Sequence, residues 1–192
     1  MNPHNSKFIK LLIYMDIAFI TITIGFAVLH CIFNKGWMLS AYITFLTISY
    51  HFSMRLIVGQ LVNVIYRKRE FNLDSIGFHI YKFEEYLYRI LKVKKWKTHM
   101  ITARPEQFNL YGNSMEVLLH NMAQAEMVHR IIMVLSFAPI ILTIPYGASM
   151  IFIATSVVAS LIDLQFVMIQ RCNRPRVLRI LKRKDGKNEK QL

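Results

Sequence analysis

Residues near the middle of this sequence have the types and spacing of a general base with an orienting carboxylate. In "AEMVHR", Glu126 and His129 lie three positions apart and would share one face of a helix. A carboxylate beside an imidazole can fix its tautomer and stabilise its protonated form, which prepares a general base. The structural alternative is an ion pair between Glu126 and Arg130, with His129 at the membrane interface. His120, nine positions from His129, would lie near the opposite side of the helix and is not expected to act with it.

A second polar group, "QRCNRPR" at 170–176, follows the last long apolar run. Positive charge alone would suit a helix that stops at the cytoplasmic membrane surface. A stop signal does not require the Gln and Asn side chains that alternate with the arginines, or the proline between two of them. We therefore interpret the segment as part of a site. A third, basic group is "KKWK" at 94–97.

The composition indicates an integral membrane protein. Of the 192 residues 54% are hydrophobic, yet the formal net charge is +13, and the mean hydropathy is +0.33. Apolar and basic residues must therefore occupy separate segments, as they do in membrane proteins. Cys31 and Cys172 do not indicate a disulfide framework, and no Cys/His cluster indicates a metal site. Nucleic-acid binding is not expected, because the basic residues border apolar segments.

Four apolar segments approach or exceed the roughly 20 residues that a helix needs to cross a membrane. Short turns join the first to the second and the third to the fourth, so each pair is expected to form a helical hairpin. We predict an all-α, polytopic membrane protein with a single membrane domain, 1–192. It would contain transmembrane helices at 11–33, 37–62, 129–146 and 148–169, a cytoplasmic surface region at 66–128 and a polybasic tail at 177–192.

The basic residues predict the orientation of these helices. Segment 67–104 carries ten Lys and Arg against four acids, segment 171–192 carries nine against two, and the short turns carry only Lys35. The positive-inside rule places both segments and both chain ends in the cytoplasm, with the protein in the cell membrane. Residues 78–97 have the pattern of an amphipathic helix on the membrane surface. The three polar groups are then expected to meet at the cytoplasmic membrane surface.

Four ionisable residues fall within or near the ends of the apolar segments: Asp16, His51, Arg55 and Asp163. An ionised group in the middle of a bilayer costs about 2.5–3.5 kcal/mol, so such groups are usually paired or face water. We predict an intramembrane pair of Arg55 with Asp163 or with Asp16. The alternative is a polar cavity that opens to the cytoplasm.

The three polar groups together resemble the glycosyl-4,4'-diaponeurosporenoate acyltransferase family of small bacterial membrane proteins. "VKKWK", "AEMVHR" and "QRCNRPRVLRILKR" are similar in order and spacing to the family's KWK-, AExxHW- and QRYNRPR-type elements, and the resemblance covers about 66–184. The chain differs at Cys172, where the family has tyrosine, and at Arg130, where it has tryptophan. Asp163 and Gln165 stand where the family has Asn and Pro.

The resemblance implies transfer of a fatty acyl group from a cytosolic donor, acyl-CoA or an acyl carrier protein, to a sugar hydroxyl of a membrane glycolipid. A glycosylated carotenoid is the candidate acceptor, and no cofactor is expected. His129 would be the base and Glu126 its partner. Anionic lipids would bind the basic tail. Oxyanion or substrate contacts are expected from Asn173, Arg171 and Gln170, and donor contacts from Arg174, Arg176, Lys95, Lys97 and Trp96.

Other functions remain open. A small membrane methyltransferase also carries charged residues at cytoplasmic helix ends, although no adenosine-binding motif is visible. A non-enzymatic accessory or lipid-binding protein would tolerate replacement of Glu126 and His129. Among acyltransferase patterns, His79 and Glu84 give HxxxxE in place of the HxxxxD of glycerolipid acyltransferases. Cys172 could carry an acyl intermediate, but direct transfer is favoured.

Overall fold

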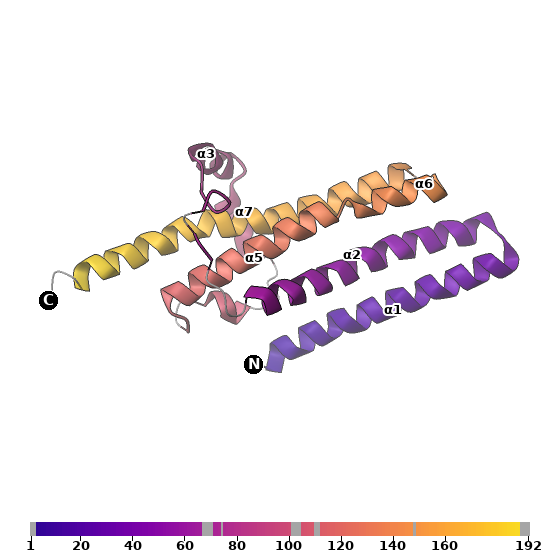
Figure 1. The fold of residues 1–192 in the computed structure, drawn as a ribbon, viewed down its shortest axis with the longest axis horizontal. Coiled ribbons are helices and arrows are strands. Elements are labelled where there is room, and N and C mark those ends of the chain that lie inside the picture. Colours follow the sequence, from indigo (N-terminus) through magenta and orange to yellow (C-terminus); the bar gives the residue numbers. More distant parts are fainter. Residues whose placement is uncertain are drawn as a thin grey trace. The chain divides into compact units, whose positions relative to one another are not determined.

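The chain folds into helices joined by short connections, and its described residues contain no strand (Figure 1). This confirms the predicted all-α class. The computed structural model describes residues 3–66, 71–73, 75–100, 105–109, 112–147 and 149–188.

The chain forms two compact units, one made of Met1–Leu61 and Ile131–Leu161, the other of Val62–Arg130 and Ile162–Leu192. All the predicted site residues except Arg55 belong to the second unit. The single membrane domain remains a prediction.

Two long helices of the first unit, α1 (Pro3–Phe33) and α2 (Gly36–Tyr66), form the predicted first hairpin (Figure 1). Asn34 in the turn has a positive φ of 46°, a conformation that Asn tolerates better than most residues. Phe26 and Phe45 stack across the hairpin with ring centroids 5.6 Å apart. Apolar and aromatic contacts therefore join the two helices.

Polar side chains within this hairpin also find partners. Ser53 donates to both carboxylate oxygens of Asp16, at 2.8 and 3.0 Å. The hydroxyls of Thr23 and Ser49 lie 3.0 Å apart. The sequence analysis offered Arg55 as a possible partner of Asp16. In the structure Asp16 accepts hydrogen bonds from Ser53 of α2.

Arg55 itself donates to backbone carbonyls. Its Nη1 bonds the oxygen of His51 at 2.9 Å, and its Nη2 reaches that of Ala159 at 3.4 Å. The His51 carbonyl is one turn away on the same helix, so the shared face of these two residues is confirmed. The pair of Arg55 with Asp163 would join residues of different units and remains a prediction.

The helix α5 (Met115–Leu135) leads directly into the third predicted span. It is followed by a 3₁₀ helix, η3 (Ala138–Leu142), and by the short α6 (Thr143–Tyr146). Pro139 accounts for the change, because proline lacks an N–H and clashes with the carbonyl four residues before it. The helix that contains the start of the span predicted at 129–146 begins at Met115, 14 residues before that span.

The last helix, α7 (Ser149–Asn188), extends beyond residue 169, where the fourth span is predicted to end; the end of the span itself remains a prediction. The helix continues through 170–176 with Pro175 inside it. The flanking turns and the contacts of the arginines, described below, hold the helix together across the lost hydrogen bond. The first part of the predicted polybasic tail, as far as Asn188, continues this helix, and its side chains from 184 onward lie outside the described residues.

Within the described residues, three helical stretches are long and apolar enough to cross a membrane: Ile9–Phe33, Met115–Tyr146 and Ser149–Arg183. This is consistent with a membrane protein. The helix α2 is as long as α1, but polar residues such as His51 and Arg55 make it less apolar, and it is not among the three. A fourth span remains a prediction.

The surface region is more broken than the predicted helix at 78–97. It contains α3 (Lys82–Ile90), α4 (Val93–Trp96) and two short 3₁₀ helices, η1 (Lys97–His99) and η2 (Pro105–Phe108). Lys92 has a positive φ of 51°, which ends the first helical segment. One face of α3 exposes three apolar side chains at i, i+4 and i+7, Phe83, Leu87 and Ile90, as the amphipathic pattern predicts.

Candidate active site

In the second unit, α5 and α7 place a histidine of one helix against a carboxylate of the other. His129 Nδ1 lies 2.9 Å from Asp163 Oδ1. Because a carboxylate only accepts hydrogen bonds, Nδ1 donates its proton and Nε2 keeps its lone pair. The Asp163 side chain is 2% exposed and that of His129 24% exposed. The carboxylate is therefore buried behind an imidazole that reaches the surface.

An aromatic ring fixes the plane of the same imidazole. Phe166, one turn of α7 from Asp163, stacks on His129 with centroids 4.5 Å apart and an interplanar angle of 9°. A carboxylate at one nitrogen and a ring against one face leave the imidazole little freedom to rotate. This arrangement suits a base that must present Nε2 to a substrate hydroxyl.

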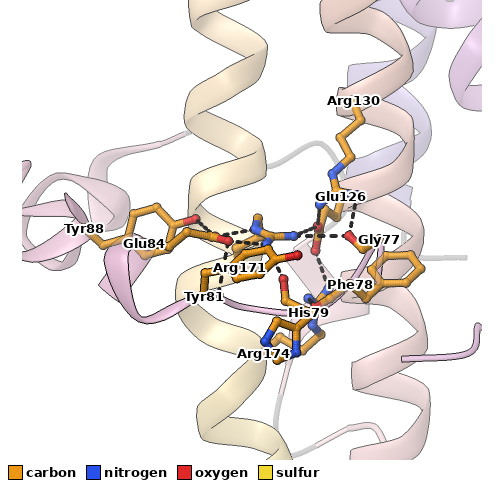
Figure 2. Close-up of polar contacts among 10 residues, drawn as sticks. All are labelled: Gly77, Phe78, His79, Tyr81, Glu84, Tyr88, Glu126, Arg130, Arg171 and Arg174. Atoms are coloured by element: carbon orange, nitrogen blue, oxygen red, sulfur yellow. Dashed lines mark hydrogen bonds and ion pairs between the residues drawn. The ribbon is translucent and has the colours of Figure 1, made fainter. Parts of the chain in front are cut away.

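Asp163 takes the place that the sequence analysis gave to Glu126. Glu126 is fully buried, and its carboxylate binds Arg130 at 2.5 Å, Arg171 at 2.8 Å and also Arg174 (Figure 2). Permanently charged guanidinium groups attract a carboxylate more strongly than a neutral imidazole does. The Glu126–Arg130 pair is confirmed, with the carboxylate buried and the Arg130 side chain 30% exposed.

Arg171 links this carboxylate to α3. Its Nε and Nη2 donate to the two oxygens of Glu84 at 2.6 and 2.5 Å, and its Nη1 donates to Glu126. The Tyr88 hydroxyl donates to Glu84 at 2.7 Å. Figure 2 shows the guanidinium between the two carboxylates. Paired, forked contacts of this kind give both strength and a defined orientation.

The segment before α3 is held by the same arginines. The carbonyl of His79 accepts from Arg171 at 2.6 Å, that of Gly77 accepts from Arg130 at 2.7 Å, and that of Phe78 accepts from Arg174 (Figure 2). Arginine side chains bind these three successive carbonyls and hold the segment in a non-helical conformation. This explains why α3 begins at Lys82 and not at residue 78.

The network of hydrogen bonds and ion pairs shifts the pKa values of two groups of the surface region, Glu84 and Tyr88. Burial alone would raise the pKa of Glu84, but hydrogen bonds from Arg171 and Tyr88 outweigh it and lower the pKa from 4.5 to about 2. Burial and the hydrogen bond to Glu84 raise the pKa of the Tyr88 hydroxyl. Glu84 is therefore an anion and Tyr88 a donor at any physiological pH.

These contacts correct the expected roles of two arginines. Arg174 is 1% exposed, and its guanidinium also lies 5.0 Å from the centre of the Phe78 ring. It is enclosed in the interior and does not face a soluble donor. The nitrogens of Arg171 are already bonded to two carboxylates and to backbone carbonyls, so it is poorly placed to bind an oxyanion.

The contact of Gln170 with substrate stays a prediction. It follows Phe166 by four positions and Asp163 by seven, so it lies on the same face of α7. The residue is 8% exposed, and its Oε1 has no hydrogen-bond partner in the described part of the chain. A buried polar atom left without a partner is costly and often marks a binding site.

Asn173 is a second amide, farther along α7. Its Oδ1 accepts a hydrogen bond from Lys97 at 2.6 Å, and burial lowers the pKa of this lysine. Seven residues separate Asn173 from Phe166, which is about 10 Å of helix rise, against about 6 Å for Gln170. Gln170 is therefore the nearer amide to the candidate base, and Asn173 with Lys97 forms a separate polar pair.

The remaining predicted donor contacts lie on the surface region and on α7. Lys95 and Arg176 are exposed and line one cavity of the second unit. The indole N–H of Trp96 donates to the carbonyl of Leu91 at 3.0 Å, so this contact closes the α3–α4 turn. Cys172, also at the cavity, is a free thiol. No cluster of His, Cys, Asp or Glu among the described residues could hold a metal ion.

Two contributors were missed from the sequence. Asp163 was recognised as a costly acid in an apolar run but was assigned to Arg55, because nothing local links it to His129. Glu84 and Tyr88 were separated by four positions, a spacing that signals contact on a helix. That signal could have identified Glu84 as a buried anion.

Comparison with known proteins identifies the family of the chain. The model of the glycosyl-4,4'-diaponeurosporenoate acyltransferase family matches residues 63–183. No curated protein and no solved structure matches the chain. The matched region covers more than half of the 192 residues and includes His129, Asp163 and the arginine network. The chain therefore belongs to the glycosyl-4,4'-diaponeurosporenoate acyltransferase family.

Proposed function

We propose that the protein transfers a fatty acyl group from a cytosolic thioester donor to a sugar hydroxyl of a membrane glycolipid, with a glycosylated carotenoid as the candidate acceptor. The observation that carries this proposal is the buried Asp163 behind His129, in a chain of an acyltransferase family. A sugar hydroxyl is a weak nucleophile until a base removes its proton. His129 has the partner and the exposure that such a base needs.

The reaction then proceeds by direct transfer. Nε2 of His129 takes the hydroxyl proton while the sugar oxygen bonds to the thioester carbonyl carbon. The tetrahedral intermediate collapses as the carbon–sulfur bond breaks, and the protonated His129 returns its proton to the leaving thiolate. Asp163 stabilises the imidazolium between these steps. The unpartnered Oε1 of Gln170 is an acceptor and can bind a hydroxyl of the sugar.

The membrane supplies the acceptor to this site. We place four spans in the cell membrane, with α2 as the fourth and both chain ends in the cytoplasm, because the basic segments flank the site. The apolar face of α3, with Phe83, Leu87 and Ile90 exposed, lies on the cytoplasmic surface of the bilayer. The basic C-terminal tail adds attraction to anionic lipids.

Mass spectrometry of membrane lipids tests this function. Cells that make glycosylated lipids would express the wild-type chain, His129→Ala or the matched control His120→Ala, with protein levels equalised. His120 lies on the same helix and packs against Phe71. We expect a glycolipid whose mass is increased by one acyl group in the wild type and in the control, and not in His129→Ala.

The lipid that shifts identifies the acceptor. An acylated glycolipid in equal amount from His129→Ala would show that this residue is not the base. The same lipid profile with the wild type as with an empty vector, in cells that contain glycosylated carotenoid, would contradict the proposed acyl transfer and favour a binding or accessory role.

A further inference from the structure

A basic cavity of about 490 Å³ lies within the second unit, beside the α3–α4 turn and the end of α7. Arg171 and four further residues of α7 line it, and the four share one helix face because they follow the spacing i, i+3, i+4 and i+7. These are Cys172, Pro175, Arg176 and Arg179. Four basic residues of the surface region line the other side: Arg89, Lys92, Lys94 and Lys95.

The charge of this cavity is far from balanced. Seven of its lining residues are Lys or Arg, and Glu85 is the one acid among them. Arg171 is neutralised by Glu84 and Glu126, but the other six cations are exposed on their surface. Like charges gathered in a concave surface repel one another and focus a positive potential, which an anionic ligand relieves. Arginine is also well suited to bind phosphate by two hydrogen bonds.

We propose that this cavity binds the phosphorylated nucleotide group of a coenzyme A thioester, which makes acyl-CoA the donor. The inference rests on the proposed acyl transfer. A nucleotide with a diphosphate and a 3'-phosphate carries about four negative charges and is small enough for a concave site of this size. A carrier protein offers a single phosphodiester on a convex surface, and would need a broad basic face in place of a concave site.

The separation between the cavity and the candidate base along α7 can be compared with the length of the rest of the donor. Ten residues separate Arg176 in the cavity from Phe166 beside His129, which is about 15 Å of helix rise. The pantetheine arm has two peptide-like amides and about the length of four or five extended residues, or about 15 Å. The arm therefore matches the separation along the helix axis; because the cavity residues of α7 lie about 160° around the helix from Asp163, Phe166 and Gln170, the arm would also have to pass around α7 to reach His129.

Cys172 provides a readout of occupancy that does not depend on catalysis. The full-length protein would carry Cys31→Ser, so that Cys172 is its one thiol, and would be held in nanodiscs of phosphatidylcholine. The rate at which a maleimide modifies Cys172 is measured against increasing acetyl-CoA, which has no free thiol. We expect saturable protection, and we expect dephosphorylation at the 3'-position to raise the half-protecting concentration at least ten-fold.

Two double variants separate the cavity from general charge. Arg89→Gln with Arg179→Gln removes two lining cations and should raise the half-protecting concentration of acetyl-CoA at least ten-fold. Lys182→Gln with Arg183→Gln removes the same charge from exposed positions of α7 outside the lining. This control should stay within two-fold of the parent.

Several results would overturn the inference. Equal protection by inorganic phosphate would show only a general anion site. Protection by acetylated carrier protein but not by acetyl-CoA would make the carrier protein the donor. If anionic lipid in the nanodisc protects Cys172 and acetyl-CoA does not compete with that lipid, the cavity is a site for lipid headgroups. Equal effects of the two double variants would place the nucleotide elsewhere.

The same assay distinguishes this inference from the proposed function. His129→Ala should keep full protection by acetyl-CoA, because the imidazole does not line the cavity. Protection in a wild-type chain that makes no acylated lipid would support the nucleotide site and contradict only the transfer reaction. Acyl transfer from acyl-CoA without any protection of Cys172 would support the transfer reaction and contradict the nucleotide site.

Discussion

At the scale of single residues, the site depends on which carboxylate binds the arginines and which binds the imidazole of His129. Glu126 is three positions from His129, yet it binds Arg130, Arg171 and Arg174. Asp163, on another helix, takes the imidazole. The two acids thus have separate tasks, since one closes a buried ion network and the other orients a candidate base.

Asp163→Asn should slow acyl transfer at least about 100-fold, because an amide no longer stabilises the imidazolium and can hold the wrong tautomer. The side-chain volume is almost unchanged, so we expect normal protein levels. The initial rate in purified protein measures the effect, with Asp16→Asn as the control for loss of a membrane-embedded acid. A rate within two-fold of the wild type would show that Asp163 does not act through His129.

The residues of the site were only partly predictable. His129 followed from its spacing to a carboxylate and its place at a span end. Its partner did not, because the 34 positions between His129 and Asp163 carry no signal of which helix faces meet. The arginines of 170–176 were recognised as unusual for a stop signal. Their partners Glu84 and Glu126 depend on side-chain packing that a single sequence does not reveal.

At the scale of elements, the buried carboxylate of Glu84 joins α3 to Arg171 of α7. The carboxylate of Glu84 accepts hydrogen bonds from Nε and Nη2 of Arg171 and from the hydroxyl of Tyr88. It also accepts from the backbone N–H of Tyr81 at 3.3 Å, which caps the start of α3. The position of α3, and of the cavity beside it, therefore depends on this carboxylate.

Glu84→Gln should loosen α3 from α7 and lower its stability by about 3 kcal/mol, because a buried guanidinium loses an anionic partner. Limited proteolysis of the purified protein should show faster cleavage in the segment 75–100. Glu85→Gln is the matched control, since Glu85 is next to Glu84 in the sequence and its side chain is exposed. Equal cleavage rates in the two variants would contradict the proposed fastening.

The same contact predicts an acid transition. The pKa of Glu84 is lowered from 4.5 to about 2, so its contribution to stability is fully present above about pH 4.5 and is lost as the pH falls toward 2. Near-ultraviolet circular dichroism against pH in detergent should show this loss. In Glu84→Gln the transition should shrink, and an unchanged transition would assign it to other carboxylates.

The ends of the elements were the least predictable features of the fold. The fourth span was expected to stop at 169, because charged residues follow it. The helix continues since Arg171 and Arg174 find buried carboxylates, and since Pro175 removes only one backbone donor. Residues 78–81 have a helical pattern but are not helical, because arginines bind the carbonyls of Phe78 and His79.

At the scale of the whole molecule, topology decides whether the site faces a cytosolic donor. Three stretches of the described chain are apolar and long enough to span a membrane, and α2 is the predicted fourth. If α2 crosses the membrane, Lys35 and Lys82 lie on opposite sides of it. The basic segments then all face the cytoplasm.

Single cysteines test this topology. In a chain with Cys31→Ser and Cys172→Ser, Lys35→Cys should react with a membrane-impermeant maleimide in intact cells. Lys82→Cys should react only after the membrane is opened. Protein levels after solubilisation provide the control for total labelling. Reaction of both positions from the same side would show that α2 does not span.

The most direct test of the central claim is the initial rate of acyl transfer by His129→Ala in purified, full-length protein, beside His120→Ala. We predict at least about a 100-fold loss for His129→Ala, as expected when a general base is removed, and a rate within two-fold of the wild type for His120→Ala. Equal rates for the wild type and His129→Ala would contradict the account, because the imidazole held by Asp163 would then have no part in the reaction.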